Sequence, residues 1–161
     1  MVLDRMVGAV LKHKIKTFPK GFYFKAKAMA TKYFLELHKK KKFPVTILRL
    51  YQAYGPKQDT NRLIPIVIKS CLKNKKFPCS TGIQYRDFLH IDDLINSILK
   101  CYDNKAAIGQ IINIGSGKPE QIKNVIGLIK NKIKRGYPQF GKIKLRSDEN
   151  IKISCLKITI L

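Results

Sequence analysis

Tyr23 and Lys27 are the residues of this sequence best placed for acid–base chemistry. They are four positions apart in a segment, residues 22–38, whose apolar side chains recur at helical spacing. Side chains four apart lie on one face of a helix, so the phenol and the ammonium can point into one cleft. A nearby cation stabilises a phenolate and lowers the pKa of a tyrosine, which suits it to proton transfer near neutral pH. The spacing alone also fits a half-buried tyrosine beside a solvated lysine.

Four further segments follow this pair along the chain. They read LRLYQAYGP at 48–56, NRLIP at 61–65, STGIQYRDFLHIDDL at 80–94 and INIGSGKP at 112–119. We interpret Asp92 and Asp93 in the third segment as caps of a helix. His90 is expected at the edge of a strand, without a catalytic task.

Helical and strand patterns alternate along most of the sequence, which is typical of α/β proteins. We expect helices at 22–38, 61–72, 92–102 and 120–132, and strands at 45–51, 77–79, 85–89, 110–114 and 142–145. The lysine run 39–42 favours the end of the first helix, because cations are stabilised at a helix C-terminus. The almost continuously apolar segment 45–51 predicts a strand buried on both faces of a parallel sheet. The third helix should turn Leu94, Ile95, Ile98 and Leu99 toward the core.

The ordered series of segments resembles the extended short-chain dehydrogenase/reductase family, specifically its nucleotide-sugar epimerases, dehydratases and 4-ketoreductases. The resemblance covers about residues 22–140. It implies NAD or NADP as cofactor, a nucleoside diphosphate sugar as substrate, and hydride transfer at the sugar C4. It also implies a homodimer formed through the helix that carries the Tyr-x-x-x-Lys motif, and a cytoplasmic enzyme.

The resemblance assigns roles to five residues. Tyr23 matches the catalytic acid/base, and Lys27 matches the lysine that holds the nicotinamide ribose and lowers the tyrosine pKa. Arg86 matches the arginine that binds the diphosphate, a suitable task for a bidentate guanidinium. Gln52 stands where relatives usually carry a substrate-contacting Asn, and Asn61 begins the Leu-Ile-Pro helix on the side of the nucleotide. As an alternative, Arg86 pairs with Asp87 or Asp92. The Gly-Ser-Gly turn at 115–117 is expected to be a structural loop.

The sequence also departs from the family pattern. Ala26 stands where relatives place Ser or Thr, and Thr31 where many carry an acid. No glycine-rich strand-to-helix turn precedes residue 22, and the segment 147–161 fits no family element. We therefore expect a chain truncated at its N-terminus and its C-terminus, which binds NAD poorly and is inactive by itself.

The expected fold is α/β, a partial Rossmann-like fold that lacks the N-terminal glycine-rich βαβ unit and carries the smaller substrate-binding lobe. We assign residues 1–60 to a remnant of the NAD-binding domain and residues 61–150 mainly to the substrate-binding lobe. A returning Rossmann strand is expected near 110–114, and residues 151–161 form an irregular tail.

The charge offers an alternative function. The 161 residues include 33 Lys and Arg against 10 Asp and Glu, a formal net charge of +23. Such an excess is typical of proteins that neutralise nucleic-acid phosphates, so a basic, non-enzymatic nucleic-acid-binding protein remains the rival hypothesis. We favour generic surface charge, because lysine predominates over arginine and is spread along the chain.

The remaining features argue against several other classes. The four cysteines are widely separated and no histidine joins them at zinc-ligand spacing, so we expect reduced thiols and no metal site. No segment has the roughly 18 apolar residues of a membrane span. We expect no signal peptide, because the apolar stretch at the start of the sequence is too short for one.

Overall fold

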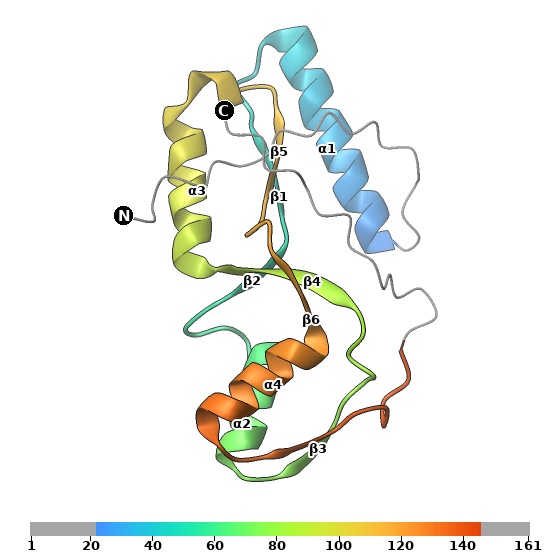
Figure 1. Ribbon diagram of the computed structural model, residues 1–161. Coiled ribbons are helices and arrows are strands. Elements are labelled where there is room, and N and C mark those ends of the chain that lie inside the picture. The colour runs from blue at the N-terminus through green and yellow to red at the C-terminus, as the bar shows by residue number, and fades with distance from the viewer. Residues whose placement is uncertain (1–21, 146–161) are drawn as a thin grey trace. The chain divides into compact units, whose positions relative to one another are not determined.

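The computed structural model describes residues 22–145 (Figure 1). The described chain divides into two compact units. The first comprises residues 22–50 and 93–114, and the second comprises residues 51–92 and 115–145. The chain therefore enters each unit twice.

The first unit is built on a pair of parallel strands. β1 (Ile47–Leu50) pairs with β5 (Ile111–Ile114) in parallel, in register from Ile47 opposite Ile111 to Leu50 opposite Ile114. The predicted parallel strand is confirmed, but its burial on both faces is wrong. Residues 47–49 are half-buried and Leu50 is half exposed, and β5 is the sole strand bonded to β1 in the described chain.

Helix α1 (Phe22–Lys41) confirms the first predicted helix and extends it by three residues beyond 38. It ends within the lysine run, as expected: Lys42 adopts a left-handed backbone conformation (φ 54°) and donates its N–H to the His38 carbonyl at 2.8 Å. His38 also contacts the next turn, since its Nδ1 lies 2.8 Å from the Phe43 carbonyl oxygen.

Helix α3 (Ile91–Asp103) begins one residue before the predicted aspartates, so the prediction that they cap it is wrong. The ring of His90, the last residue of a strand, instead accepts the Asp92 N–H at Nδ1, at 3.3 Å. The predicted apolar face is also only partly correct. Leu94 is buried, whereas three other members are 40–54% exposed: Ile95, Ile98 and Leu99. A short 3₁₀ turn, η2 (Lys105–Ala107), leads from α3 to β5.

The second unit holds a mixed three-stranded sheet, two helices and a two-stranded ribbon. The sheet has the order β2-β4-β6, formed by β2 (Gln52–Tyr54), β4 (Tyr85–His90) and β6 (Pro119–Gln121). β2 is parallel to β4, and β6 is antiparallel to it. The ribbon pairs β3 (Lys76–Pro78) with β7 (Tyr137–Gln139) in parallel. The predicted strand at 142–145 is wrong: those residues form no strand, and the pairing partner of β3 lies upstream at β7.

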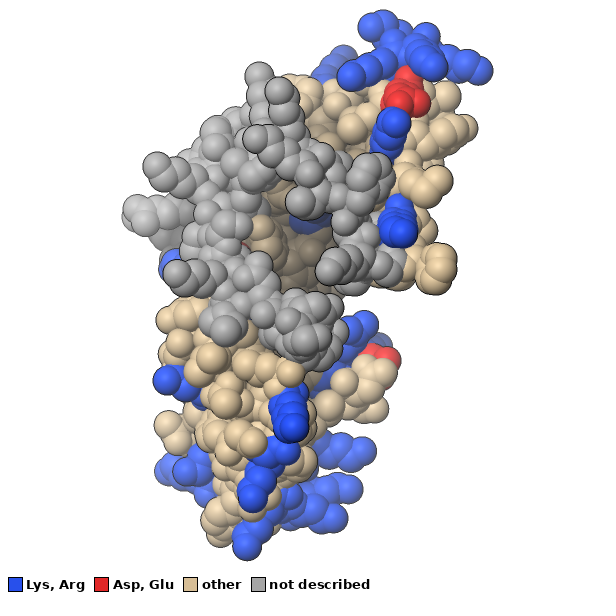
Figure 2. All heavy atoms as spheres, turned by 90° about the vertical axis from the view of Figure 1, so that its right-hand side faces the viewer, with Lys and Arg blue, Asp and Glu red and all other residues tan. Residues whose placement is uncertain are grey.

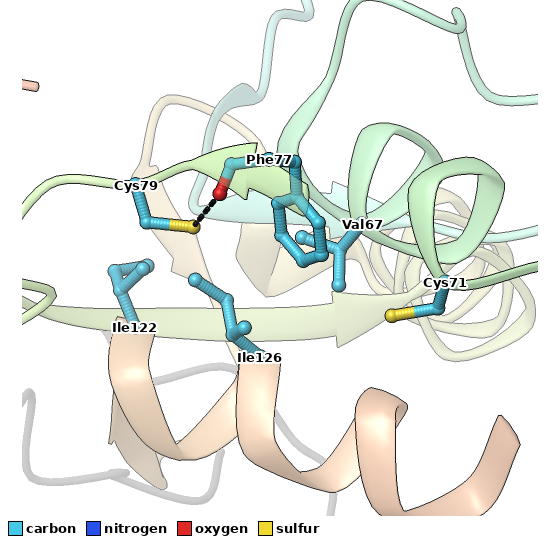
Figure 3. Close-up of a cluster of buried hydrophobic side chains, with 6 residues drawn as sticks. All are labelled: Val67, Cys71, Phe77, Cys79, Ile122 and Ile126. Carbon is cyan, nitrogen blue, oxygen red and sulfur yellow. Dashed lines mark hydrogen bonds between the residues drawn. The ribbon is translucent and has the colours of Figure 1, made fainter. Parts of the chain in front are cut away.

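Helices α2 (Leu63–Leu72) and α4 (Ile122–Ile133) pack against each other and confirm two predicted helices. Pro65 lies in the first turn of α2, where its missing N–H costs no helical hydrogen bond. Between the helices and β3 lies a cluster of buried side chains: Val67, Cys71, Phe77, Cys79, Ile122 and Ile126. Figure 3 shows the two isoleucines projecting from α4 toward Phe77 and Cys79.

Cys71 and Cys79 belong to this core as apolar groups. Both thiols are free, and burial raises their pKa, so each stays in its neutral form. Gly136 makes the packing around Cys71 possible, because a Cβ at this position would lie 2.7 Å from the Cys71 Cα. Its φ of +89° also favours glycine. Cys155 lies outside the described residues.

Among the described helices, none is both long enough and apolar enough to cross a bilayer. Within residues 22–145, no group of three or more His, Cys, Asp or Glu side chains is arranged to hold a metal ion.

Candidate functional site

The predicted acid–base pair lies at the start of α1 in the first unit. The Lys27 ammonium is 5.6 Å from the centroid of the Tyr23 ring, so the expectation that both side chains share one helix face is confirmed. Tyr23 is 68% exposed and Lys27 is exposed as well. The pair is therefore accessible to a ligand, and the lysine places a positive charge against the phenol ring.

The second unit contains a cavity of about 380 Å³ that brings together two of the predicted substrate residues, Gln52 and Arg86. Its walls are mostly apolar and come from α2, β3, β4 and α4. Among the lining residues are Leu63, Ile66, Val67, Phe77, Phe88, Ile122 and Ile126. A cavity with apolar walls and a few polar groups is the usual form of a small-molecule site.

Arg86 lies on β4 and is half-buried. Its Nη1 donates to the Tyr85 carbonyl at 2.6 Å. Of the two acids named as alternative partners, Asp87 accepts backbone N–H groups, and an Asp92 oxygen lies 3.4 Å from the His90 ring. The pairing of Arg86 with either acid stays a prediction. Arg86 is among the residues that line the cavity, and its guanidinium carries a positive charge there.

The buried carboxylate of Asp87 holds the Gly-Ser-Gly turn against β4. It accepts the Ser116 N–H at 2.7 Å, the Ser116 hydroxyl at 2.6 Å and the Gly117 N–H at 2.9 Å. Gly115 allows this approach, since a Cβ there would lie 2.7 Å from the carboxylate oxygen. Because the carboxylate occupies these two N–H groups, the turn offers no cradle for a phosphate. Its prediction as a structural loop is confirmed.

Gln84 and Ser80 are polar residues of the cavity that sequence reasoning missed. Gln84 is only 9% exposed, and its Nε2 lies 3.3 Å from the Ser80 hydroxyl oxygen. Its Oε1 is buried and has no hydrogen-bond partner. A signal was available, because residues 84, 86 and 88 alternate along an extended segment and all three line the cavity.

Asn61 is not among the cavity-lining residues. It lies exposed in the turn before α2, where its backbone N–H donates to Asp59 Oδ1 at 3.2 Å. The structure thus brings Gln52 and Arg86 together and leaves Asn61 outside. Its predicted contact with substrate stays a prediction.

The fold and the order of the motifs agree with the result of a family comparison. The model of the NAD dependent epimerase/dehydratase family matches residues 6–115. The chain belongs to this family. The match begins upstream of the expected residue 22 and includes the acid–base helix, β4 with Arg86, and β5.

Curated proteins of this kind are similar to the chain in sequence. CDP-abequose synthase of Salmonella muenchen is 32% identical over 104 residues, which cover 63% of this chain and 36% of that protein. dTDP-D-glucose 4,6-dehydratase of Dictyostelium discoideum is 37% identical over 99 residues, covering 61% of this chain and 23% of the relative. The chain thus matches about a third or less of the length of these relatives.

Solved structures confirm the partial Rossmann-like fold of the extended short-chain dehydrogenase/reductase type. dTDP-glucose 4,6-dehydratase from Bacillus anthracis, solved in complex with NAD, is 25% identical with a TM-score of 0.73, covering 86% of this chain and 46% of that chain. UDP-glucose 4-epimerase from Thermotoga maritima, solved with UDP-glucose, has a TM-score of 0.76 at 21% identity and shows the likeness of fold over 96% of this chain and 53% of that chain.

The residues of the described chain fit one end of a nicotinamide dinucleotide. Tyr23, which is 68% exposed as a residue, and Lys27 carry a hydroxyl and an ammonium, groups of the kind that bind ribose hydroxyls. For the pyrophosphate, by contrast, the one Gly-Ser-Gly turn in residues 22–145 is already bonded to Asp87.

Proposed function

We propose that this chain takes part in the NAD- or NADP-dependent conversion of a nucleoside diphosphate sugar at C4, as an epimerase, dehydratase or reductase. The observation that carries the proposal is the cavity of the second unit, which Gln52 and Arg86 line together with mostly apolar side chains. Family membership supplies the class of reaction.

In this proposal each polar group of the cavity binds a different part of the substrate. The Arg86 guanidinium binds the diphosphate, for which a bidentate cation is well suited. Gln52 contacts the sugar, and the apolar walls hold the base. The unpaired Gln84 Oε1 accepts a hydrogen bond from the Watson–Crick edge of the base. The relatives described above are named for CDP-, dTDP- and UDP-sugars, which supports a pyrimidine base.

The acid–base step is assigned to the α1 pair. The Tyr23 phenolic oxygen takes the proton from the C4 hydroxyl, and returns it when the reaction runs in the other direction. Lys27, whose ammonium lies 5.6 Å from the centroid of the Tyr23 ring, holds the cofactor ribose beside the phenol. The nicotinamide, when bound, supplies the acceptor for the hydride that leaves the same carbon. Cofactor binding by this chain is expected to be weak, because its described residues fit only the ribose.

The two compact units suit two roles. The first, with the α1 pair and the parallel strands β1 and β5, is assigned to the cofactor-binding domain, and the second, with the cavity, to the substrate-binding lobe. The partner assigned to α1 is a second copy of the chain, because Phe22, Met29 and Tyr33 expose an apolar stripe on this helix.

The substrate assignment is tested by titrating the full chain with UDP-glucose, dTDP-glucose and CDP-glucose in a calorimeter. We expect saturable binding that Arg86→Gln weakens roughly ten- to a hundredfold, the usual worth of hydrogen bonds to a charged group. Arg135→Gln is the matched control, since it removes the same charge from an exposed position of the same unit. Equal losses in the two variants, or no binding of any of the three ligands, would contradict the proposal.

A further inference from the structure

A second hollow of the second unit lies on the opposite side of α2 from the substrate cavity. It is a groove of about 390 Å³ between α2 and the loop that follows β2. The two hollows share no lining residue: α2 gives Ile66 and Val67 to the cavity, and Ile68 and Lys69 to the groove. The groove is therefore a separate candidate site, and its chemistry does not depend on the nucleotide-sugar proposal.

Three lysines line this groove: Lys57 from the loop, Lys69 from α2, and Lys73 just after it. None of them pairs with a carboxylate of the described residues. Segment 63–79, which includes α2, contains neither Asp nor Glu. The one acid of the loop that follows β2, Asp59, accepts the Asn61 N–H at 3.2 Å and forms no ion pair with a described lysine. Figure 2 shows Lys and Arg side chains gathered at the end of the second unit, with no acidic side chain among them. Uncompensated like charges around a concave surface create a field that attracts anions.

Gln58, one of the residues that line the groove, carries an unpaired acceptor. Gln58 donates its Nε2–H to the Ala53 carbonyl at 2.8 Å, and this contact fixes which side of the amide carries the oxygen. The Oε1 is buried and has no hydrogen-bond partner. A buried acceptor calls for a donor, and a hydroxyl of a ligand would supply one. The neighbouring Lys57 has a positive φ of 63°, a strained conformation for a non-glycine residue that is often found where a ligand is clamped.

We propose that this groove binds a phosphorylated small molecule that also carries hydroxyl groups, such as a sugar phosphate. The ammonium groups of Lys57, Lys69 and Lys73 bind the phosphate. The exposed apolar side chains of Ile68 and Leu72 lie under the carbon skeleton, and Gln58 Oε1 accepts a hydrogen bond from a hydroxyl.

The test titrates the full chain with glucose 6-phosphate, inorganic phosphate and uncharged glucose. We expect glucose 6-phosphate to bind several-fold more tightly than phosphate, because of one additional hydrogen bond, and glucose not to bind. Replacing Lys57, Lys69 and Lys73 together by alanine should weaken both anions roughly tenfold. Gln58→Met should abolish the advantage of glucose 6-phosphate and leave the affinity for phosphate unchanged.

The matched control replaces Lys118, Lys123 and Lys142 together by alanine, which removes the same charge from exposed positions of the same unit that do not line the groove. We expect this variant to keep the affinity of the parent chain within about twofold, since screening weakens surface charges outside the groove. Equal losses in the two triple variants would overturn the proposal in favour of diffuse surface charge. Equal binding of phosphate and glucose 6-phosphate would overturn it as well, because Gln58 would then have no part in recognition.

Discussion

At the level of single residues, the buried Asp87 carboxylate has a defined structural task next to the proposed diphosphate-binding residue. Its two oxygens accept three hydrogen bonds from the turn at residues 115–117. Because Asp87 follows Arg86 directly on β4, this contact also fixes the backbone from which the guanidinium extends. The network therefore supports the cavity wall without touching a ligand.

Asp87→Asn should destabilise the chain by about 3 kcal/mol, because an amide group cannot accept with both of its heavy atoms and the charge-assisted bonds are lost. Urea unfolding monitored by circular dichroism measures this change. Asp59→Asn is the control, since Asp59 is exposed and accepts one N–H at 3.2 Å. A loss in Asp87→Asn no larger than the loss in the control would show that the network contributes little.

The sequence predicted part of the site at this scale. Arg86 and Gln52 were found from the motif order, and both line one cavity. Gln84 was missed, because its importance comes from burial without a partner, which no residue type or spacing reveals. The prediction that aspartates cap α3 was wrong. The ring of His90, at the end of β4, accepts the Asp92 N–H at the start of this helix.

At the level of elements, α1 combines the acid–base pair with an exposed apolar stripe. Phe22 is 93% exposed, and Met29 and Tyr33 are 68% and 62% exposed. Their spacing of seven and four residues places them along one side of the helix, next to the small side chains of Ala26 and Ala30. A second copy of the helix would bury such a stripe.

We expect the full chain to be a dimer, and Met29→Glu with Tyr33→Glu to make it a monomer, because buried carboxylates would face each other across the interface. Light scattering coupled to size exclusion measures the mass. The matched control, Ile98→Glu with Tyr102→Glu, alters two exposed apolar residues of α3 and should leave the dimer intact. A monomeric parent chain, or dissociation in the control, would argue against the interface.

Within residues 22–145, all four α-helices were predicted from the sequence, whereas three of the seven strands were missed. β2, β6 and β7 are each three residues long, too short for an alternating pattern to be recognised. β7 also contains a proline, which argues against a strand when only sequence is available. Its pairing with β3 depends on contacts between segments about sixty residues apart.

At the level of the whole molecule, successive segments of the chain belong alternately to its two units. Residues 22–50 and 93–114 form one unit around parallel strands, and residues 51–92 and 115–145 form the other. From the sequence we expected one domain boundary near residue 60. We also expected one later segment, the strand near 110–114, to belong to the first domain again. Local composition cannot show more, because segments distant in sequence share a unit through strand pairing and helix packing.

At this scale, part of the positive charge of the chain can be assigned to particular segments. Of the net charge of +23, part lies in segment 63–79 of the second unit, which contains no acid. Arg86 belongs to the proposed nucleotide-sugar cavity, and Lys57, Lys69 and Lys73 to the groove across α2. The two hollows would thus bind different anions of related chemistry.

The central claim, that the cavity of the second unit binds a nucleoside diphosphate sugar, is tested most directly by mapping amide and side-chain NMR shifts of the full chain during titration with UDP-glucose. We expect saturable shifts at the cavity residues Gln52, Gln84 and Arg86. Shifts confined to Lys57, Lys69 and Lys73, or spread over the surface without saturation, would contradict the claim.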